Sequence, residues 1–306
     1  MSAPVKRLLV TGSTGFVGGH VLAAAEQGLF GEVDVHVTPP GWDLRNHDEV
    51  VGQVAIARPD WVLHLAGQSF VPRSFEDPED TFQINLIGTL NLLLGLRQAG
   101  FKGRMVYVSS GDVYGQVAEE DMPVHEASVA RPRSPYGVSK LAAEQLCLQW
   151  SRTEGLDVMI ARPFNHIGPG QAEQFVIPSL ARQVAAIADG VQPAVINAGD
   201  IDVSRDFTDV RDVVAAYAAM LQGGHSGASY VVGSGRERTI RSLLEILCCL
   251  AGVKVDIRQD ASRLRPSEQR RMCSDPGLLF AHTGWKASIP VEITLEQILM
   301  HARTKQ

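Results

Sequence analysis

The sequence predicts an α/β fold, a doubly wound parallel sheet followed by a smaller C-terminal α/β lobe. A short apolar segment near the amino terminus leads directly into a glycine-rich turn and then into a helical apolar pattern. Further short apolar segments alternate with amphipathic ones, which is the pattern of a parallel sheet with crossover helices. The 306 residues, 45% hydrophobic and 20% charged, are those of an ordinary globular chain large enough for two coupled lobes.

The first strand and its turn carry the strongest local signal. The apolar run Arg7–Thr11 reads as a buried strand and is followed at once by Gly12-Ser13-Thr14-Gly15-Phe16-Val17-Gly18. Gly12 permits the tight turn, Gly15 lets the backbone approach a pyrophosphate, and Gly18 lets the next helix pack closely. The helix amino terminus offers free N–H groups to anionic oxygens. A glycine turn can be only a turn, but this placement favours a Rossmann-type dinucleotide site.

The second strand, Glu32–Val37, bears on the choice of cofactor. An NAD-selective site usually places Asp or Glu near the end of this strand, where it binds the ribose hydroxyls. Here Thr38-Pro39-Pro40-Gly41 follows instead, and Arg45 is the nearest arginine. We therefore expect NADPH, with NADH as the alternative. Asp43 and Leu44 either meet the adenine or belong to the start of the next helix.

The next two strands end in small residues. The strand Asp60–Gly67 closes with Leu65-Ala66-Gly67, which would let a flat ring lie against the backbone, and a loop begins at Gln68. A helical pattern over Asp80–Arg97, which contains Asn85, leads to the strand Arg104–Val108. Ligands of open α/β sheets bind at the carboxyl ends of strands, so these loops are expected to line the site.

The pair Tyr136 and Lys140 lies at the start of a helix predicted from Val138 to about Glu154. Four residues apart, both side chains share one helix face. A tyrosine with a reference pKa of ~10 is a poor acid or base at neutral pH. A neighbouring lysine, and a positively charged nicotinamide ring if one were bound, would favour the phenolate and lower this pKa. Such a pair often means only an aromatic side chain beside a solvated lysine. Together with Ser110 at a strand's carboxyl edge, Tyr136 could hold a carbonyl oxygen as a hydride acceptor requires.

Composition argues against several other classes of protein. The net charge of −6 without a basic tract disfavours nucleic acid as a partner, and no apolar run is long enough for a membrane span. The amino terminus lacks the features of a signal peptide, so we expect a cytoplasmic protein. None of the cysteines forms a Cys-x-x-Cys pair, which predicts core thiols and neither disulfides nor a metal site. These cysteines are Cys147, Cys248, Cys249 and Cys273.

Three segments, taken in order along the chain, resemble those of the extended short-chain dehydrogenase/reductases, the NAD-dependent epimerase/dehydratase family. They are Thr11–Gly18, Ser109-Ser110 and Tyr136-x-x-x-Lys140. The resemblance implies that Tyr136 is the acid/base, that Lys140 holds the nicotinamide ribose and lowers the tyrosine pKa, and that Ser110 binds the substrate oxygen. The cofactor contacts that it implies are Gly12, Thr14, Gly15, Phe16, Val17, Gly18, Asp43, Leu44, Leu65, Ala66, Gly67, Ser109, Tyr136, Lys140 and Pro163.

The second half is similar to nucleotide-sugar members of this family. The segment Ala161–Gly170 resembles one in which Pro163 borders the nicotinamide and Asn165 meets the sugar nucleotide, and His166 reads as a packed histidine. The segment Asp200–Phe207 is similar to the diphosphate-binding segment of these proteins. The segment Leu264–Glu268 is similar to the C-terminal signature of GDP-mannose 4,6-dehydratases and their reductase relatives. The substrate contacts implied are Ser69, Asp112, Asn165, Arg205, Arg265 and Glu268.

The stretch Ser110-Gly111-Asp112 separates the reactions within this group. Dehydratases resembling this chain carry a glutamate where Asp112 stands, and that glutamate removes a carbon-bound proton. Asp112 is one methylene shorter and Gly111 supplies no side chain, and a base must lie within hydrogen-bonding reach of its proton. We keep Asp112 in the candidate catalytic set and expect a simple carbonyl reduction. The resemblance to the reductase relatives implies that the substrate is a GDP-linked deoxy-keto sugar, GDP-4-dehydro-6-deoxy-D-mannose, reduced at C4 to GDP-D-rhamnose.

Three alternatives remain open at this point. A GDP-mannose 4,6-dehydratase or a nucleotide-sugar 4-epimerase would hold its NAD(P) tightly, and a non-catalytic NADP(H)-binding regulator would use the same scaffold. The complete set of Ser110, Tyr136 and Lys140 disfavours the regulator. The face of C4 that receives hydride does not follow from the sequence, so a talo product is the alternative to the rhamno product.

We expect residues 1–163, with about 201–232, to form the dinucleotide-binding domain. Residues from about 164–200 and 233–306 would form the nucleotide-sugar lobe, with substrate between the two. By analogy with the family, a homodimer is expected, through the helices predicted at Asp80–Arg97 and Val138–Glu154.

Overall fold

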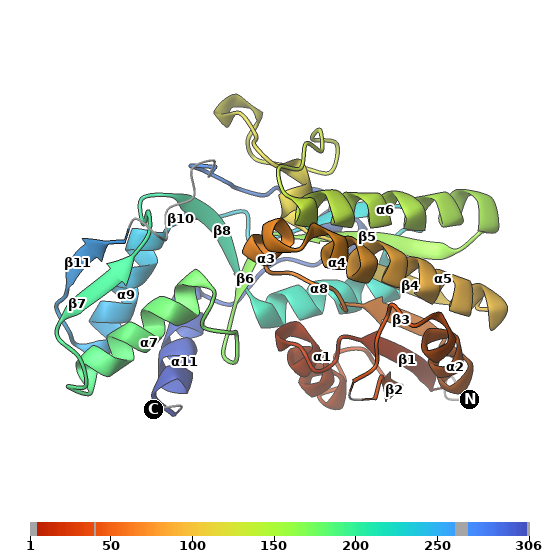
Figure 1. Cartoon of the computed structure of the whole chain (residues 1–306), viewed down its shortest axis with the longest axis horizontal. Helices are drawn as coiled ribbons and strands as arrows, with labels where there is room; N and C mark the ends of the chain where they lie inside the picture. Colours follow the sequence, from red (N-terminus) through yellow and green to blue (C-terminus); the bar gives the residue numbers. More distant parts are fainter. Residues whose placement is uncertain (1–4, 40, 261–268, 305–306) are drawn as a thin grey trace.

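A six-stranded sheet forms the centre of the chain, and every neighbouring pair of its strands is parallel (Figure 1). The computed structural model describes residues 5–39, 41–260 and 269–304. In spatial order the strands are β2 (Val33–Val37), β1 (Lys6–Thr11), β3 (Trp61–His64), β4 (Arg104–Val108), β5 (Asp157–Pro163) and β9 (Ser229–Val232). The predicted doubly wound parallel sheet is confirmed.

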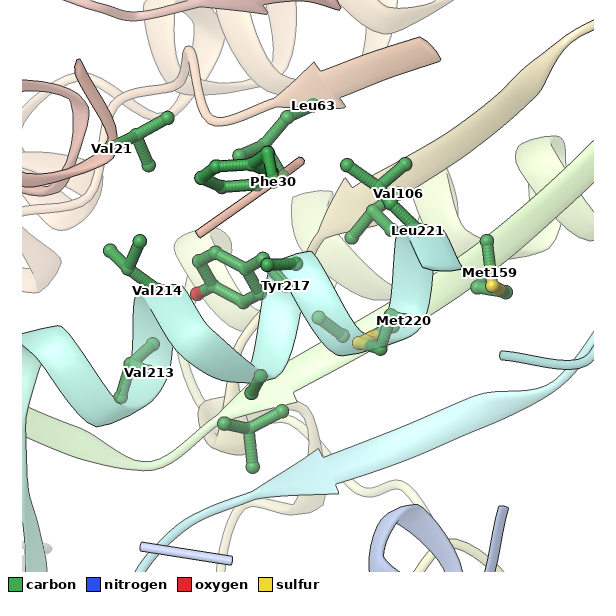
Figure 2. Close-up of a cluster of buried hydrophobic side chains, with 14 of the residues drawn as sticks. Val21, Phe30, Leu63, Val106, Met159, Val213, Val214, Tyr217, Met220 and Leu221 are labelled. Atoms are coloured by element: carbon green, nitrogen blue, oxygen red, sulfur yellow. The ribbon is translucent and has the colours of Figure 1, made fainter. Parts of the chain in front are cut away.

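Helices cover both faces of this sheet, because its strands are apolar on both sides. On one face Leu8 and Val10 pack with α1, α8 and α10, and on the other Leu9 packs with α2, α5 and α6. Figure 2 shows part of the first cluster, in which Tyr217 and Leu221 of α8 pack with Val106 of the sheet. The helices are α1 (Phe16–Glu26), α8 (Val210–Gly223), α10 (Gly277–Thr283), α2 (His47–Ala57), α5 (Gly88–Gln98) and α6 (Pro135–Glu154).

The strand order reverses at β1, which has β2 on one side and β3 on the other. Ligands of open α/β sheets bind at the carboxyl ends of the strands next to such a point. Gly12, directly after β1, has φ +75°, and a Cβ there would lie 2.7 Å from the backbone N of Ala66, which follows β3. The turn after β1 therefore touches the backbone after β3, and only glycine fits this position.

A second, smaller lobe lies to the left in Figure 1 and has its own apolar core. The chain enters it directly from β5, since Pro163 ends that strand and Asn165 begins β6. Its sheets are β10 (Glu237–Thr239), β8 (Ser204–Asp209) and β6 (Asn165–Ile167) in one, and β11 (Asp256–Gln259) and β7 (Val195–Ala198) in the other. Its helices are α7 (Val176–Ala188), α9 (Ile240–Ala251) and α11 (Val291–Thr304).

Two predicted helices differ in detail from the structure. The helix expected over Asp80–Arg97 is three pieces, α4 (Pro78–Phe82), a π-helical turn η1 (Gln83–Ile87) and α5. The helix expected from Val138 begins earlier, at Pro135, because the Ser134 hydroxyl accepts a hydrogen bond from the N–H of Gly137 at 3.0 Å and caps it. The remaining short elements are α3 (Val71–Glu76), η2 (Gly111–Tyr114) and η3 (Glu119–Asp121).

All four cysteines are free thiols. Cys147 is buried, as predicted, but the prediction is wrong for Cys249, which is exposed. Successive residues of a helix lie about 100° apart, so an adjacent pair in α9 cannot both face the core. Within the residues that the structure describes, no helix has the length and apolar character of a membrane span, and no cluster of His, Cys, Asp or Glu could hold a metal ion.

Candidate active site

Ser110, Asp112 and Tyr136 come together at the carboxyl end of β4. Ser110 caps η2, and its hydroxyl accepts a hydrogen bond from the N–H of Asp112 at 3.1 Å. The side chain of Ser110 and the carboxylate of Asp112 both lie close enough to the Tyr136 phenol to change its pKa. The pair of hydroxyls expected to hold a carbonyl oxygen is thus present in the folded chain.

The environment of Tyr136 keeps its phenol protonated. Burial raises its pKa well above the ordinary value, the negative charge of Asp112 raises it further, and the hydrogen bond with Ser110 only partly offsets the two. This direction is opposite to the one expected from Lys140. The expectation counted the charges of Lys140 and of a bound nicotinamide ring, whereas the phenol is only 7% exposed and loses most of its solvation.

Lys140 lies on the same face of α6 as Tyr136 and is also buried. Burial lowers the pKa of its ammonium group to about 8, although Glu144 and Cys147 raise it. The Nζ atom lies 4.9 Å from the centre of the Tyr107 ring, and a Cβ on Gly67 would come within 3.6 Å of it. The ammonium group therefore points to the small residues that follow β3, where a flat ring was expected.

Asn85 connects the loop after β3 with helix α6, a role that was not predicted. Its amide oxygen accepts a hydrogen bond from the N–H of Gln68 at 2.8 Å, and its nitrogen donates to the carbonyl of Gln68 and to Ser139 Oγ, both at 3.0 Å. The Ser139 hydroxyl in turn donates to the carbonyl of Tyr136 at 2.8 Å. Asn85 lies in the π-helical turn η1, and such turns are frequent at functional sites.

The amino terminus of α1 has the donors that a pyrophosphate needs. Its cap is Gly15, no side chain of the described residues caps it, and its first turn has no acidic residue. A Cβ on Gly18 would lie 2.3 Å from the carbonyl oxygen of Gly12, so the helix packs directly on the turn. Thr14 precedes the cap, and Phe16 and Val17 begin the helix. This arrangement fits a dinucleotide phosphate.

Residues expected near the adenine make other contacts. Leu44 is 5% exposed and packs with the helical core. Asp43 binds Arg45 through paired hydrogen bonds, and Arg45 also binds Asp80 at 2.8 Å. The Asp43 carboxyl has a lowered pKa, chiefly because of its hydrogen bonds with Arg45. In the structure, the charge of Arg45 is thus shared by two carboxylates.

The expected sugar-nucleotide residues lie around the entrance to the second lobe. Asn165 is exposed at the start of β6, and Arg205 lies on the neighbouring strand β8. One Arg205 nitrogen donates to the carbonyl of Ser204 at 2.7 Å. Ser69 is exposed in the loop after β3. His166 is packed as expected: it stacks on the Phe16 ring at 6.2 Å, and burial lowers its pKa.

The structure places the other described residues of the expected site at the carboxyl ends of β3, β4 and β5. Ser109 is buried beside Ser110, and Pro163 is buried at the end of β5. Leu65 and Ala66 lie directly after β3. Arg265 and Glu268 lie outside the described residues.

Comparison with known proteins identifies closely similar chains. A family model described as GDP-mannose 4,6 dehydratase matches residues 28–298. GDP-6-deoxy-D-mannose reductase of Pseudomonas aeruginosa is 51% identical over 296 residues, which cover 96% of each chain. The solved structure of RMD from Pseudomonas aeruginosa complexed with NADPH has a TM-score of 0.92 at 48% identity, over 99% of this chain and 100% of that one. GDP-mannose 4,6-dehydratase of Yersinia enterocolitica is 28% identical over 85% of this chain and 77% of its own.

Proposed function

The chain belongs to the GDP-mannose 4,6 dehydratase family of extended short-chain dehydrogenase/reductases, and from this premise we propose that it reduces GDP-4-dehydro-6-deoxy-D-mannose to GDP-D-rhamnose with NADPH. The chain is an oxidoreductase that acts on a nucleotide sugar. The observation that carries the proposal is 51% identity to a GDP-6-deoxy-D-mannose reductase over 96% of both chains. The convergence of Ser110 with a protonated Tyr136 gives this reaction a physical basis.

The side chains act on the C4 carbonyl oxygen. NADPH, held by the glycine turn after β1 and by Lys140, would supply the hydride. Ser110 and Tyr136 both donate hydrogen bonds to the oxygen, on which negative charge develops. Tyr136 then gives up its phenolic proton to that oxygen, and its raised pKa ensures that the proton is present at neutral pH. The charge of Lys140 stabilises the phenolate that remains.

The rest of the substrate is proposed to bind in the second lobe. Asn165 and Arg205 would hold the diphosphate, together with Arg265, and Glu268 would bind the nucleoside ribose. Contacts far from C4 orient the carbon that reacts. In this scheme residues 1–163 with about 201–232 bind the dinucleotide, and residues from about 164–200 and 233–306 bind the nucleotide sugar.

The test is incubation of the chain with NADPH and GDP-4-dehydro-6-deoxy-D-mannose, with NMR identification of the product. NADPH should be consumed only in the presence of the keto sugar, and the rhamno or talo configuration of the product reveals the hydride face. Conversion of GDP-mannose without added reductant would instead identify a dehydratase. Tight NADPH binding without turnover of any nucleotide sugar would identify a regulator.

We also propose that the chain forms a homodimer and acts in the cytoplasm. Support for the dimer comes from apolar side chains that are exposed on neighbouring elements, Phe75 of α3, Ile87 of η1 and Val138 of α6. A dimer through this surface would cover them. Light scattering on the purified chain measures the mass, and a monomer at micromolar concentration would contradict this part of the proposal.

A further inference from the structure

A buried ion pair lies behind the candidate active site. Glu144 of α6 is fully buried and Arg162 of β5 is 7% exposed. The guanidinium group donates from Nη2 to Glu144 Oε2 at 2.7 Å and from Nε to the two carboxylate oxygens at 3.1 and 3.2 Å. No role in the reaction described above uses either residue.

This pair joins the elements that carry the reacting groups. Arg162 also donates from Nη1 to the Tyr114 hydroxyl at 3.0 Å and to the carbonyl of Glu126 at 3.3 Å. Tyr114 ends η2, the turn that begins after Ser110, and Arg162 directly precedes Pro163. Helix α6, strand β5 and turn η2 are therefore held in one register by the guanidinium group.

The pair also places a negative charge beside Lys140. Tyr136, Lys140 and Glu144 follow one another at intervals of four residues, so they share a face of α6. Buried ion pairs seldom make a protein more stable than apolar side chains of similar volume would. A structural role alone therefore gives little reason for a fully buried carboxylate at this position.

Because Lys140 is buried, the charge of the Glu144 carboxylate affects the pKa of its ammonium group. Burial lowers the pKa of Lys140 to about 8, and the charge of Glu144 opposes this shift more than Cys147 does. The other groups that interact with Lys140 are Tyr107 on β4 and His64 on β3, and Tyr136 lies on the same face of α6. Burial and the charge of Lys140 lower the pKa of His64 to about 3, so His64 is neutral and supplies no compensating charge.

We propose that Glu144, held in place by Arg162, is a positioning residue that keeps Lys140 in its cationic form and holds Tyr136 in register with Ser110. The part that concerns turnover rests on the proposed function. The part that concerns the charge of Lys140 does not, because it can be measured through NADPH binding alone.

The first test is Glu144→Gln, which keeps the shape of the side chain and removes its charge. A nearby opposite charge moves a pKa by about 1–3 units. The alkaline limits of NADPH affinity and of kcat should move to lower pH by that amount, while KM for the keto sugar at neutral pH changes little. Fluorescence titration of NADPH over a pH series gives the first limit, and steady-state kinetics give the second.

A matched control is Asp157→Asn at the other end of β5. Asp157 accepts a hydrogen bond from Arg104 Nε at 2.9 Å, so this variant also leaves an arginine without its carboxylate. It should lower stability and leave both alkaline limits where they are in the wild type. An equal shift in Asp157→Asn would show that the effect is general, and would overturn the proposal.

A double variant separates charge from folding. If Glu144→Gln does not fold, Glu144→Met with Arg162→Met removes both charges without leaving either unpaired. The same downward shift in the NADPH-binding limit supports the proposal, and a folded double variant with the wild-type limit refutes it. Should the wild type reduce no keto sugar, the proposed function fails, and the NADPH-binding limits still decide the role of Glu144.

Discussion

Replacement of Tyr136 by phenylalanine separates the chemistry of the site from its stability. The variant removes one hydroxyl, which lies close to Ser110, from a side chain that is 7% exposed. Loss of one neutral hydrogen bond costs about 0.5–1.5 kcal/mol of folding free energy. Loss of a general acid lowers turnover by about 10²–10⁴-fold. At 1.36 kcal/mol per factor of ten, the barrier rises by about 3–5 kcal/mol.

The assay follows oxidation of NADPH by absorbance with saturating GDP-4-dehydro-6-deoxy-D-mannose. Urea unfolding measures the stability of the same preparations, and fluorescence titration measures NADPH binding, which should stay close to wild type. Tyr230→Phe is the matched control, because the Tyr230 hydroxyl accepts from the N–H of His225 and bonds with His282, both at 2.8 Å. The control should lose at least as much stability and keep its turnover. Wild-type turnover in Tyr136→Phe, or equal losses in both variants, would refute the assignment of Tyr136.

Four further outcomes follow from the same site. Ser110→Ala removes one donor to the developing oxyanion and should lower kcat by about 10²–10³-fold, as measured by the same assay. Gly12→Ala places a Cβ 2.7 Å from the Ala66 backbone N and should weaken NADPH binding in a fluorescence titration, whereas Gly19→Ala, with nothing within 4 Å, should not. Turnover should fall as the pH rises through about 8, the lowered pKa of Lys140. Between pH 8 and 10.5, the ordinary pKa of a lysine, the unfolded chain keeps a proton that folded Lys140 has lost. The contribution of this group to stability should therefore rise with pH, and Lys140→Met should abolish that increment in thermal unfolding.

The parts of the site that follow from the sequence are local in origin. The turn after β1 needs glycine for backbone reasons, and the intervals between Gly12, Gly15 and Gly18 correspond to a turn and one helical turn. The spacing of Tyr136 and Lys140 defines a common helix face wherever that helix packs. Such features are contained in a few consecutive residues, so they can be read before the fold is known.

The parts that did not follow from the sequence depend on contacts between distant residues. Asn85 reaches Ser139 across the fold, and Glu144 meets Arg162 only because α6 packs on β5. The direction of the Tyr136 pKa shift is another example. It is dominated by burial, which depends on every element around the phenol and not on the neighbour four residues away.

The electrostatics of Tyr136 bear on the direction of the reaction. A reaction that begins by oxidising a sugar hydroxyl needs a base at this position, and a phenol is a base only when it has lost its proton. Here burial and the charge of Asp112 both hold the proton on Tyr136, with only partial compensation from Ser110. A reduction needs the opposite, a phenol that still has its proton to give.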